Sequence, residues 1–174
     1  QYLDVLSESV NNPLRFMLGW ALVSEHFLPP SSVILAYWMG GAYLMAIKRY
    51  AEYRFINNPT LAAKYRRSFS FYTEETLLLS AFFYALTSAF FLGVFLIKYR
   101  IEFILAMPFL ALLFTWYLKI GMQTNSVTQT PEKLYTQTVF MAYLVFTGLL
   151  VGALMLIDIP ELNILLYTQP TESL

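Results

Sequence analysis

The sequence contains no cysteine and only one histidine among its 174 residues. Without cysteine the chain can form neither a disulfide scaffold nor a thiolate metal site. A single histidine cannot build a histidine-rich metal centre. Basic and acidic residues number 11 each, so the formal net charge is zero and no basic field indicates a nucleic-acid partner. The sequence also shows no glycine-rich phosphate loop and no nucleophile triad.

Charged residues are scarce, making up 13% of the chain against about 25% in an ordinary soluble domain. Hydrophobic residues make up 58% of it. With 15 Phe, 13 Tyr and 3 Trp, the composition is that of a folded chain and not of a disordered one. Because there is too little polar surface to coat a water-facing globule, the sequence predicts an integral membrane protein.

Long apolar runs supply the transmembrane helices of this prediction. A helix needs about 20 mostly apolar residues to cross a hydrocarbon core about 30 Å thick. Three runs meet this requirement, namely Thr76–Ile97, Phe103–Leu118 and Thr138–Ile157. A fourth run, Ser32–Ile47, is short but continues into basic residues whose long stems can reach the interface. The fifth, Leu3–Val23, is less regular and polar at its start.

The fold class predicted from these runs is an all-α integral membrane bundle of about five transmembrane helices. The bundle would comprise residues 1–158, and residues 159–174 would form a non-cytoplasmic tail. Pro108 is expected to kink the fourth helix. Gly148 and Gly152 are spaced to allow close packing of the fifth helix inside the bundle.

Loop charges predict the orientation in the cell inner membrane, because cytoplasmic loops carry an excess of Lys and Arg. Two loops of the five-helix layout lie on one side and hold eight basic residues between them. The other side holds only Lys98 and Arg100. The eight-residue side is therefore expected to be cytoplasmic; its basic residues are Lys48, Arg49, Arg54, Lys64, Arg66, Arg67, Lys119 and Lys133.

The first candidate site is a polar stripe on the first helix. Glu8, Asn12 and Arg15 are spaced i, i+4, i+7, which places them on one face of a continuous helix. Ionisable groups at membrane depth are costly and are functional candidates by default, so the stripe could line a wet cavity open to the cytoplasm. A Glu8–Arg15 ion pair, or an interfacial helix start that never enters hydrocarbon, explains the pattern equally well.

The second candidate site follows the second apolar helix and comprises Lys48, Arg49, Glu52 and Arg66. If the helix continues past the membrane, Lys48 and Glu52 face one another at i, i+4. Clustered Lys and Arg at a membrane surface suit a phosphate or pyrophosphate group, with Arg capable of bidentate contact. Attraction of ordinary stop-transfer residues to anionic lipid headgroups explains such a cluster as well.

Several short segments give the chain a resemblance to a known family. In order, these are Leu3-Asp4-Val5, Leu14-Arg15 with Gly19, Lys48-Arg49-Tyr50-Ala51-Glu52, Arg66 or Arg67, Tyr72-Thr73, Pro108-Phe109 and Pro131-Glu132. Together they resemble the C-terminal part of the UbiA superfamily of membrane prenyltransferases. Within that superfamily, they are most similar to the polyprenyl-phosphate (decaprenyl-phosphate) phosphoribosyltransferase branch.

The resemblance implies a helical bundle around a central cavity that opens to the cytoplasm. Members bind a diphosphate through Mg²⁺ held by two acidic motifs. In the phosphoribosyltransferase branch, the donor would be phosphoribosyl pyrophosphate and the acceptor a polyprenyl phosphate. Lys48, Arg49 and Arg66 could then hold phosphate oxygens, and Glu52 could assist metal or pyrophosphate binding.

The chain also departs from the family pattern. The first acidic motif, of the type Asn-Asp-x-x-Asp, has no match here, so most Mg²⁺ ligands would lie outside this sequence. The resemblance thus implies the second part of a transferase, and the start at Gln1 is consistent with a longer polypeptide. The alternative is a non-catalytic descendant that serves as a structural subunit of a larger membrane complex, contacting lipids and other membrane subunits.

Overall fold

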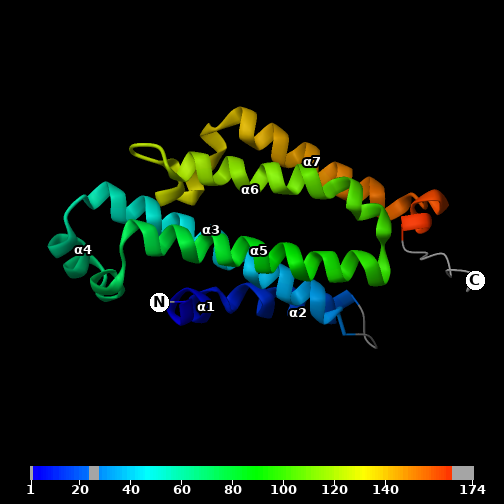
Figure 1. Ribbon diagram of the computed structural model, residues 1–174, viewed down its shortest axis with the longest axis horizontal. Helices are drawn as coiled ribbons and strands as arrows, with labels where there is room; N and C mark the ends of the chain where they lie inside the picture. The colour runs from blue at the N-terminus through cyan, green and yellow to red at the C-terminus, as the bar shows by residue number, and fades with distance from the viewer. Residues whose placement is uncertain (1, 24–27, 166–174) are drawn as a thin grey trace, which may run out of the picture.

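The computed structural model describes residues 2–23 and 28–165, which form helices and their connections without a strand (Figure 1). The α-helices in these ranges are α1 (Tyr2–Ser9), α2 (Asn11–Val23), α3 (Ser31–Ile56), α4 (Pro59–Tyr65), α5 (Glu74–Tyr99), α6 (Met107–Gly121) and α7 (Thr138–Leu156). Short 3-10 segments join them: η1 (Arg67–Phe71), η2 (Ile101–Ala106), η3 (Val127–Gln129), η4 (Pro131–Thr136) and η5 (Pro160–Leu165).

α3 is the central helix of the bundle. It lies along α5 for most of its length, and it also contacts α1, α2 and α6. α6 and α7 form a second pair beside the α3–α5 pair (Figure 1). The C-terminal end of α3, α4, η1 and the connection from α6 to α7 gather at one end of the molecule, which we call the basic end (Figure 1). The connection from α5 to α6 and the end of α7 lie at the opposite end (Figure 1).

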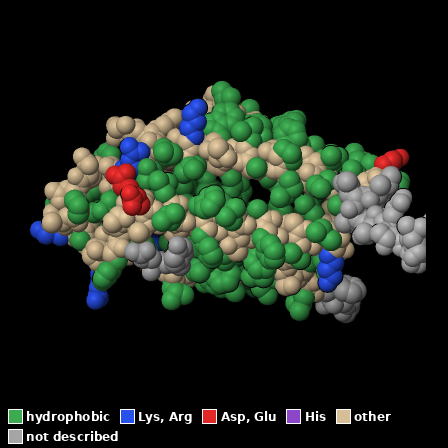
Figure 2. Space-filling model, viewed as in Figure 1, with side chains coloured by type: hydrophobic (Ala, Val, Ile, Leu, Met, Phe, Trp, Pro, Cys, Tyr) green, Lys and Arg blue, Asp and Glu red, His purple; other side chains and the backbone are tan. Residues whose placement is uncertain are grey.

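Three helical segments are long and apolar enough to cross a membrane: Glu74–Tyr99, Ile101–Gly121 and Thr138–Leu156. They correspond to the three clean apolar runs of the sequence, and their length and composition confirm an all-α protein with candidate membrane spans. Figure 2 shows hydrophobic side chains across the middle of the visible face, with charged side chains toward its ends. α3 is long, but its apolar part ends at Lys48, and it is not among the candidate spans.

The N-terminal run does not form the single helix expected over Leu3–Val23. α1 ends at Ser9 and α2 begins at Asn11, with a turn at Val10 between them. Pro13 lies in the first turn of α2, where its missing N–H costs nothing, whereas a helix continuing through it would lose a hydrogen bond. With 8 and 13 residues, both helices are shorter than the roughly 20 residues of a span.

Two smaller expectations are also corrected. Pro108 does not kink a helix, because the chain is in the 3-10 segment η2 up to Ala106 and Pro108 occupies the first turn of α6. Gly148 and Gly152 have no atom within 4 Å of an added Cβ, so they do not mark close packing inside the bundle. Gly121 does mark close packing, since a Cβ added there would overlap Ile47 of α3.

The hydrophobic core surrounds α3. Its fully buried members come from α1, α3, α5, α6 and α7: Val5, Met39, Ala42, Tyr43, Ala46, Ile47, Ala81, Tyr84, Tyr117, Ile120 and Phe140. Small residues on α3 let its neighbours approach closely, and the ring of Tyr43 stacks on Phe114 of α6 with centroids 4.7 Å apart. The Tyr43 hydroxyl donates to the Phe114 carbonyl at 2.5 Å. This packing fixes the register of α3, and so the position of the charged residues near its end.

Candidate functional site

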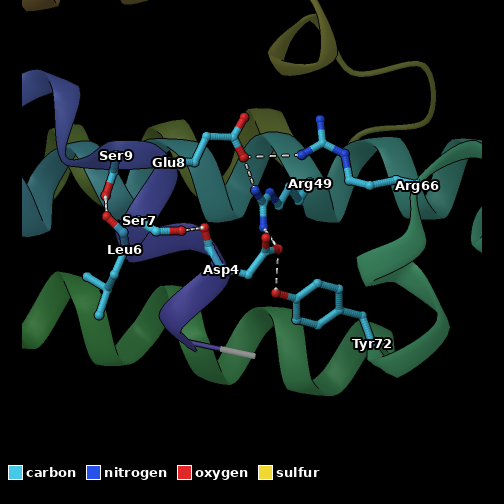
Figure 3. A network of polar contacts seen from close by, with 8 residues as sticks. All are labelled: Asp4, Leu6, Ser7, Glu8, Ser9, Arg49, Arg66 and Tyr72. Carbon is cyan, nitrogen blue, oxygen red and sulfur yellow. Dashed lines mark hydrogen bonds and ion pairs between the residues drawn. The ribbon is translucent and has the colours of Figure 1, made fainter.

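Arg49 is the centre of a charged network at the basic end (Figure 3). It lies on α3 just beyond the apolar stretch, and only 1% of its surface is exposed. One terminal nitrogen of its guanidinium contacts the Asp4 carboxylate, and the other contacts the Glu8 carboxylate. Asp4 and Glu8 are one helical turn apart on α1, so both acids face α3. Arg49 is therefore held between two carboxylates of the same chain.

Two further residues extend this network toward η1. Arg66 donates from Nη1 to Glu8 Oε2 at 3.3 Å, and the Tyr72 hydroxyl donates to Asp4 Oδ2 at 3.1 Å (Figure 3). Arg66 is the residue that links α4 to η1, where the chain is extended, and Tyr72 directly follows η1. The network thus joins α1, α3 and the connection to α5.

Apolar and neutral contacts fix α1 in the same position. Val5 is 1% exposed and belongs to the core. The indole N–H of Trp38, on α3, donates to the Leu6 carbonyl at 3.3 Å and to Ser9 Oγ at 3.0 Å. These uncharged contacts come from residues next to Asp4 and Glu8 in the sequence. They therefore hold α1 against α3 close to both of its charged residues.

The charges in the network shift the acid–base equilibria of its members. Partial burial would raise the pKa of Asp4, but the charge of Arg49 and hydrogen bonds from Arg49 and Tyr72 hold that pKa below its usual range. Burial would lower the pKa of Arg49, yet Asp4 and Glu8 raise it further above its ordinary value. Asp4 and Arg49 are thus both stabilised in their charged forms.

Glu52 behaves differently from Asp4. Burial raises its pKa above the ordinary value, although Arg66, Lys48 and Arg49 all act to lower it. Its buried Oε2 atom has no hydrogen-bond partner among the described residues. α3 does continue past Lys48 as expected, but no ion pair within 4 Å joins Lys48 to Glu52 in the part of the chain that the structure describes. Glu52 is therefore a half-buried acid that lies close to cations but makes no ion pair with them.

The structure brings some of the predicted site residues together and separates others. Glu8, Arg49 and Arg66 meet in one network, and Lys48 and Glu52 lie on the same helical turns as Arg49. Asn12 instead packs on the backbone of Gly41, where an added Cβ would lie 2.5 Å from its Nδ2. Arg15 is exposed on α2, and no ion pair reaches it within residues 2–23 and 28–165. The expected stripe is thus divided, since the turn at Val10 separates Glu8 from the other two residues.

Two members of the network were not among the predicted site residues. Asp4 precedes Glu8 by four residues, a spacing that indicates a shared helix face. Tyr72 gave no such signal, because its contact with Asp4 depends on how the α4–η1 segment folds back onto α1.

An apolar cleft of about 610 Å³ lies between α5 and α6. Residues such as Phe82, Leu86, Leu110 and Leu118 line it, and Tyr43 of α3 contributes to its floor. Figure 2 shows a hollow between the two layers of helices in this region. The polar groups in the wall are engaged, as the Ser88 hydroxyl donates to the Ala36 carbonyl at 2.9 Å and the Thr115 hydroxyl to the Ala111 carbonyl at 2.9 Å. A cleft of this kind suits a hydrocarbon chain.

The described residues do not form a metal site. No group of three or more His, Asp or Glu side chains in residues 2–23 and 28–165 could hold a metal ion. The carboxylates of Asp4 and Glu8 are already engaged by Arg49. No family model, no curated protein and no solved structure matches the chain.

Proposed function

We propose that this integral membrane protein is the UbiA-like second part of a transferase, which binds a lipid phosphate and the pyrophosphate group of phosphoribosyl pyrophosphate at its basic end. The observation that carries the proposal is the meeting of Glu8, Arg49 and Arg66, from three separate segments, in one network beside Lys48 and Glu52. Charged side chains brought together in this way beside apolar helices suit a phosphoryl group at the membrane surface.

The apolar cleft supports the lipid part of this proposal. A polyprenyl phosphate has a long hydrocarbon chain and a charged head, so it needs an apolar site at membrane depth and a polar site at the interface. The cleft between α5 and α6 extends to Met122, at the end of α6 that faces the basic end. Such an acceptor would place its chain between two candidate spans and its phosphate at the basic end, where Arg54 donates to the Met122 carbonyl.

Charge balance limits what the chain can do alone. The network and its neighbours contain three acids, Asp4, Glu8 and Glu52, and three bases, Lys48, Arg49 and Arg66. A pyrophosphate group therefore meets no net positive charge here unless further cations join the site. Since no described group of residues fits Mg²⁺, the proposal assigns its ligands to residues outside this chain and gives this chain the role of binding and orienting the phosphates.

Binding to the detergent-solubilised protein tests this proposal. With Mg²⁺ in the buffer to supply the further cation, phosphoribosyl pyrophosphate should bind to the wild-type chain. Both Lys48→Ala and Arg66→Ala should weaken binding about tenfold, because each removes a charged contact worth about 1.4 kcal/mol. Arg15→Ala is the matched control, since Arg15 is exposed and lies outside the network. Calorimetry supplies the affinities. Equal affinities for all four proteins would refute the site assignment.

Transfer activity tests the reaction itself. Membranes that contain the complete protein should transfer phosphoribose from its pyrophosphate to a polyprenyl phosphate with Mg²⁺, and Lys48→Ala and Glu52→Ala should reduce turnover. If binding is lost in these variants but transfer is absent even from the wild type, the chain binds phosphate without acting as part of a transferase.

A structural subunit of a larger membrane complex is the second candidate, and one observation favours it. Arg49 is buried and is neutralised by two acids of the same chain, which is what a structural ion pair requires. In that case phosphoribosyl pyrophosphate should not bind, and the protein should co-purify with another membrane protein in mild detergent at a fixed ratio.

A further inference from the structure

A second, polar pocket at the basic end is separate from the charged network. It has a volume of about 360 Å³ and lies between the end of α3, the start of α5 and the connection that follows α6. Its lining is mostly hydrogen-bonding side chains, in contrast to the apolar cleft: Arg54, Asn57, Glu74, Gln123, Thr124 and Asn125, with Ala51 and Phe55. A pocket of this size fits a small polar ligand.

The charge of the pocket is balanced within the pocket itself. Arg54 Nε lies 3.6 Å from Glu74 Oε2, and Arg54 Nη1 donates to the Met122 carbonyl at 2.7 Å and to the Tyr50 hydroxyl at 3.3 Å. Arg54 is thereby fixed between α3, α5 and the end of α6. Because one cation faces one anion, the pocket offers no net charge to a phosphate, and an uncharged ligand is favoured over an anionic one.

The amide side chains of the lining come from unusual backbone positions. Asn57 has φ 46° and Asn125 has φ 57°, and in residues 2–23 and 28–165 they are the two non-glycine residues with positive φ. They belong to distant segments of the chain, yet both line this pocket. Left-handed backbone is uncommon at non-glycine residues, and asparagine is among those that adopt it most readily. Asn57 does so where α3 ends, so the backbone itself places both amides in the pocket lining.

We infer that this pocket binds an uncharged polyhydroxylated ring, a sugar or the sugar headgroup of a lipid. Amides both donate and accept hydrogen bonds, and the Glu74 carboxylate can accept from two neighbouring hydroxyls. Phe55, which is 62% exposed, offers an apolar surface for the C–H face of such a ring. The inference is independent of the proposed function, because it requires neither phosphate binding nor transfer.

Two probes distinguish the sources of the ring. Free glucose and ribose are tested by saturation-transfer NMR on the detergent-solubilised protein, and glucosyl-diacylglycerol is tested by its retention on the protein in nanodiscs of phosphatidylcholine. Binding of the free sugars assigns the pocket to a soluble ligand, and binding of the glycolipid alone assigns it to a headgroup. Absence of binding in both experiments overturns the inference, as does competition by inorganic phosphate for the same signal.

Glycine variants separate binding from folding. Asn57→Gly and Asn125→Gly remove the amides but keep the left-handed backbone favourable, so the melting temperature should not fall. Each variant, and Glu74→Gln, should weaken sugar binding about tenfold for the loss of one or two hydrogen bonds. Lys64→Ala, at an exposed position of α4 outside the lining, is the control and should bind as the wild type does. Unchanged affinity in both glycine variants would show that the amides serve the backbone alone.

Discussion

α3 and α7 differ both in the charge that they carry and in how much of their surface is buried. α7 has no charged residue, and its buried residues Phe140, Thr147 and Leu154 form a single stripe with seven-residue spacing. α3 buries ten residues, among them Arg49, and carries several charges in its last turns. The most apolar helix is thus on the outside, as expected of a helix that faces lipid, and the more polar helix is in the centre, where other helices satisfy its polar groups.

In these two helices, the more apolar helix is the more exposed one, so hydropathy and burial are not correlated. In a water-soluble domain, apolar residues are mostly buried, but exposed residues such as Val145, Leu149 and Leu156 of α7 are apolar, as expected of a surface that faces lipid. Arg49 is tolerated in the interior because Asp4 and Glu8 pair with it. Substitutions in the charged network or on the exposed face of α7 test the two halves of this contrast separately.

The largest effect is expected from removing both acids that pair with Arg49. In the Asp4→Asn, Glu8→Gln double variant, a guanidinium that is 1% exposed loses both countercharges, which should cost about 3–5 kcal/mol of unfolding free energy. Thermal unfolding in detergent measures the loss. Glu132→Gln, an exposed acid in η4, should leave stability unchanged. A double variant as stable as this control would mean that the network does not hold α1 in place.

A charge on the outer face of α7 should have the next largest effect. Leu149 is 70% exposed, so Leu149→Arg would be harmless in a water-facing helix. In a span it should cost about 2.5–3.5 kcal/mol of insertion free energy. An insertion assay that reports the membrane-integrated fraction of α7 measures this cost, with Leu149→Ala as the size control. Equal insertion of the two variants would argue that this face is not in contact with lipid.

Glycine positions sharpen the contrast between packed and lipid-facing surfaces. Gly121→Ala should destabilise the protein by about 1–3 kcal/mol, because the new methyl group overlaps Ile47 in the core. Gly148→Ala should be neutral or slightly stabilising, since nothing lies near the added atom and alanine favours the helix. Melting temperatures of the two variants in the same detergent test the difference. A reversed order would show that α7 packs against protein through Gly148.

The smallest effects concern pH. Asp4 has a lowered pKa in the folded state, so it contributes stability above its unfolded pKa of about 3.9, and that contribution is lost as the pH falls through the folded value. Glu52 has a raised pKa, so it imposes a cost at neutral pH that disappears as the pH falls through its folded value. Asp4→Asn should therefore lower the melting temperature at pH 7 and Glu52→Gln should raise it slightly. Both differences from the wild type should vanish at strongly acidic pH, and persistence there would contradict these origins.

The sequence predicts the three candidate spans well, because an uncharged apolar run of about 20 residues is long enough to form a helix of that length. It predicts the N-terminal segment poorly, because the i, i+4, i+7 spacing of Glu8, Asn12 and Arg15 assumes a continuous helix, and the break at Val10 depends on Pro13 and on docking against α3. Glu8, Arg49 and Arg66 were selected from the sequence because they are charged residues beside apolar runs, and their role in a site stays a prediction. Their pairing could not be predicted, since it depends on tertiary contacts between α1, α3 and the residue that links α4 to η1.

We propose that the chain crosses a bilayer with its basic end in the cytoplasm, and the lack of cysteine in this sequence makes the proposal directly testable. Ser70→Cys and Thr136→Cys place single thiols at the exposed basic end, and Asp158→Cys places one beyond α7 at the opposite end. A membrane-impermeant maleimide added to sealed, intact cells should label only the cysteine at position 158, and all three should react after the membrane is opened. Labelling of position 70 or 136 in intact cells, or equal labelling of all three, would contradict the account.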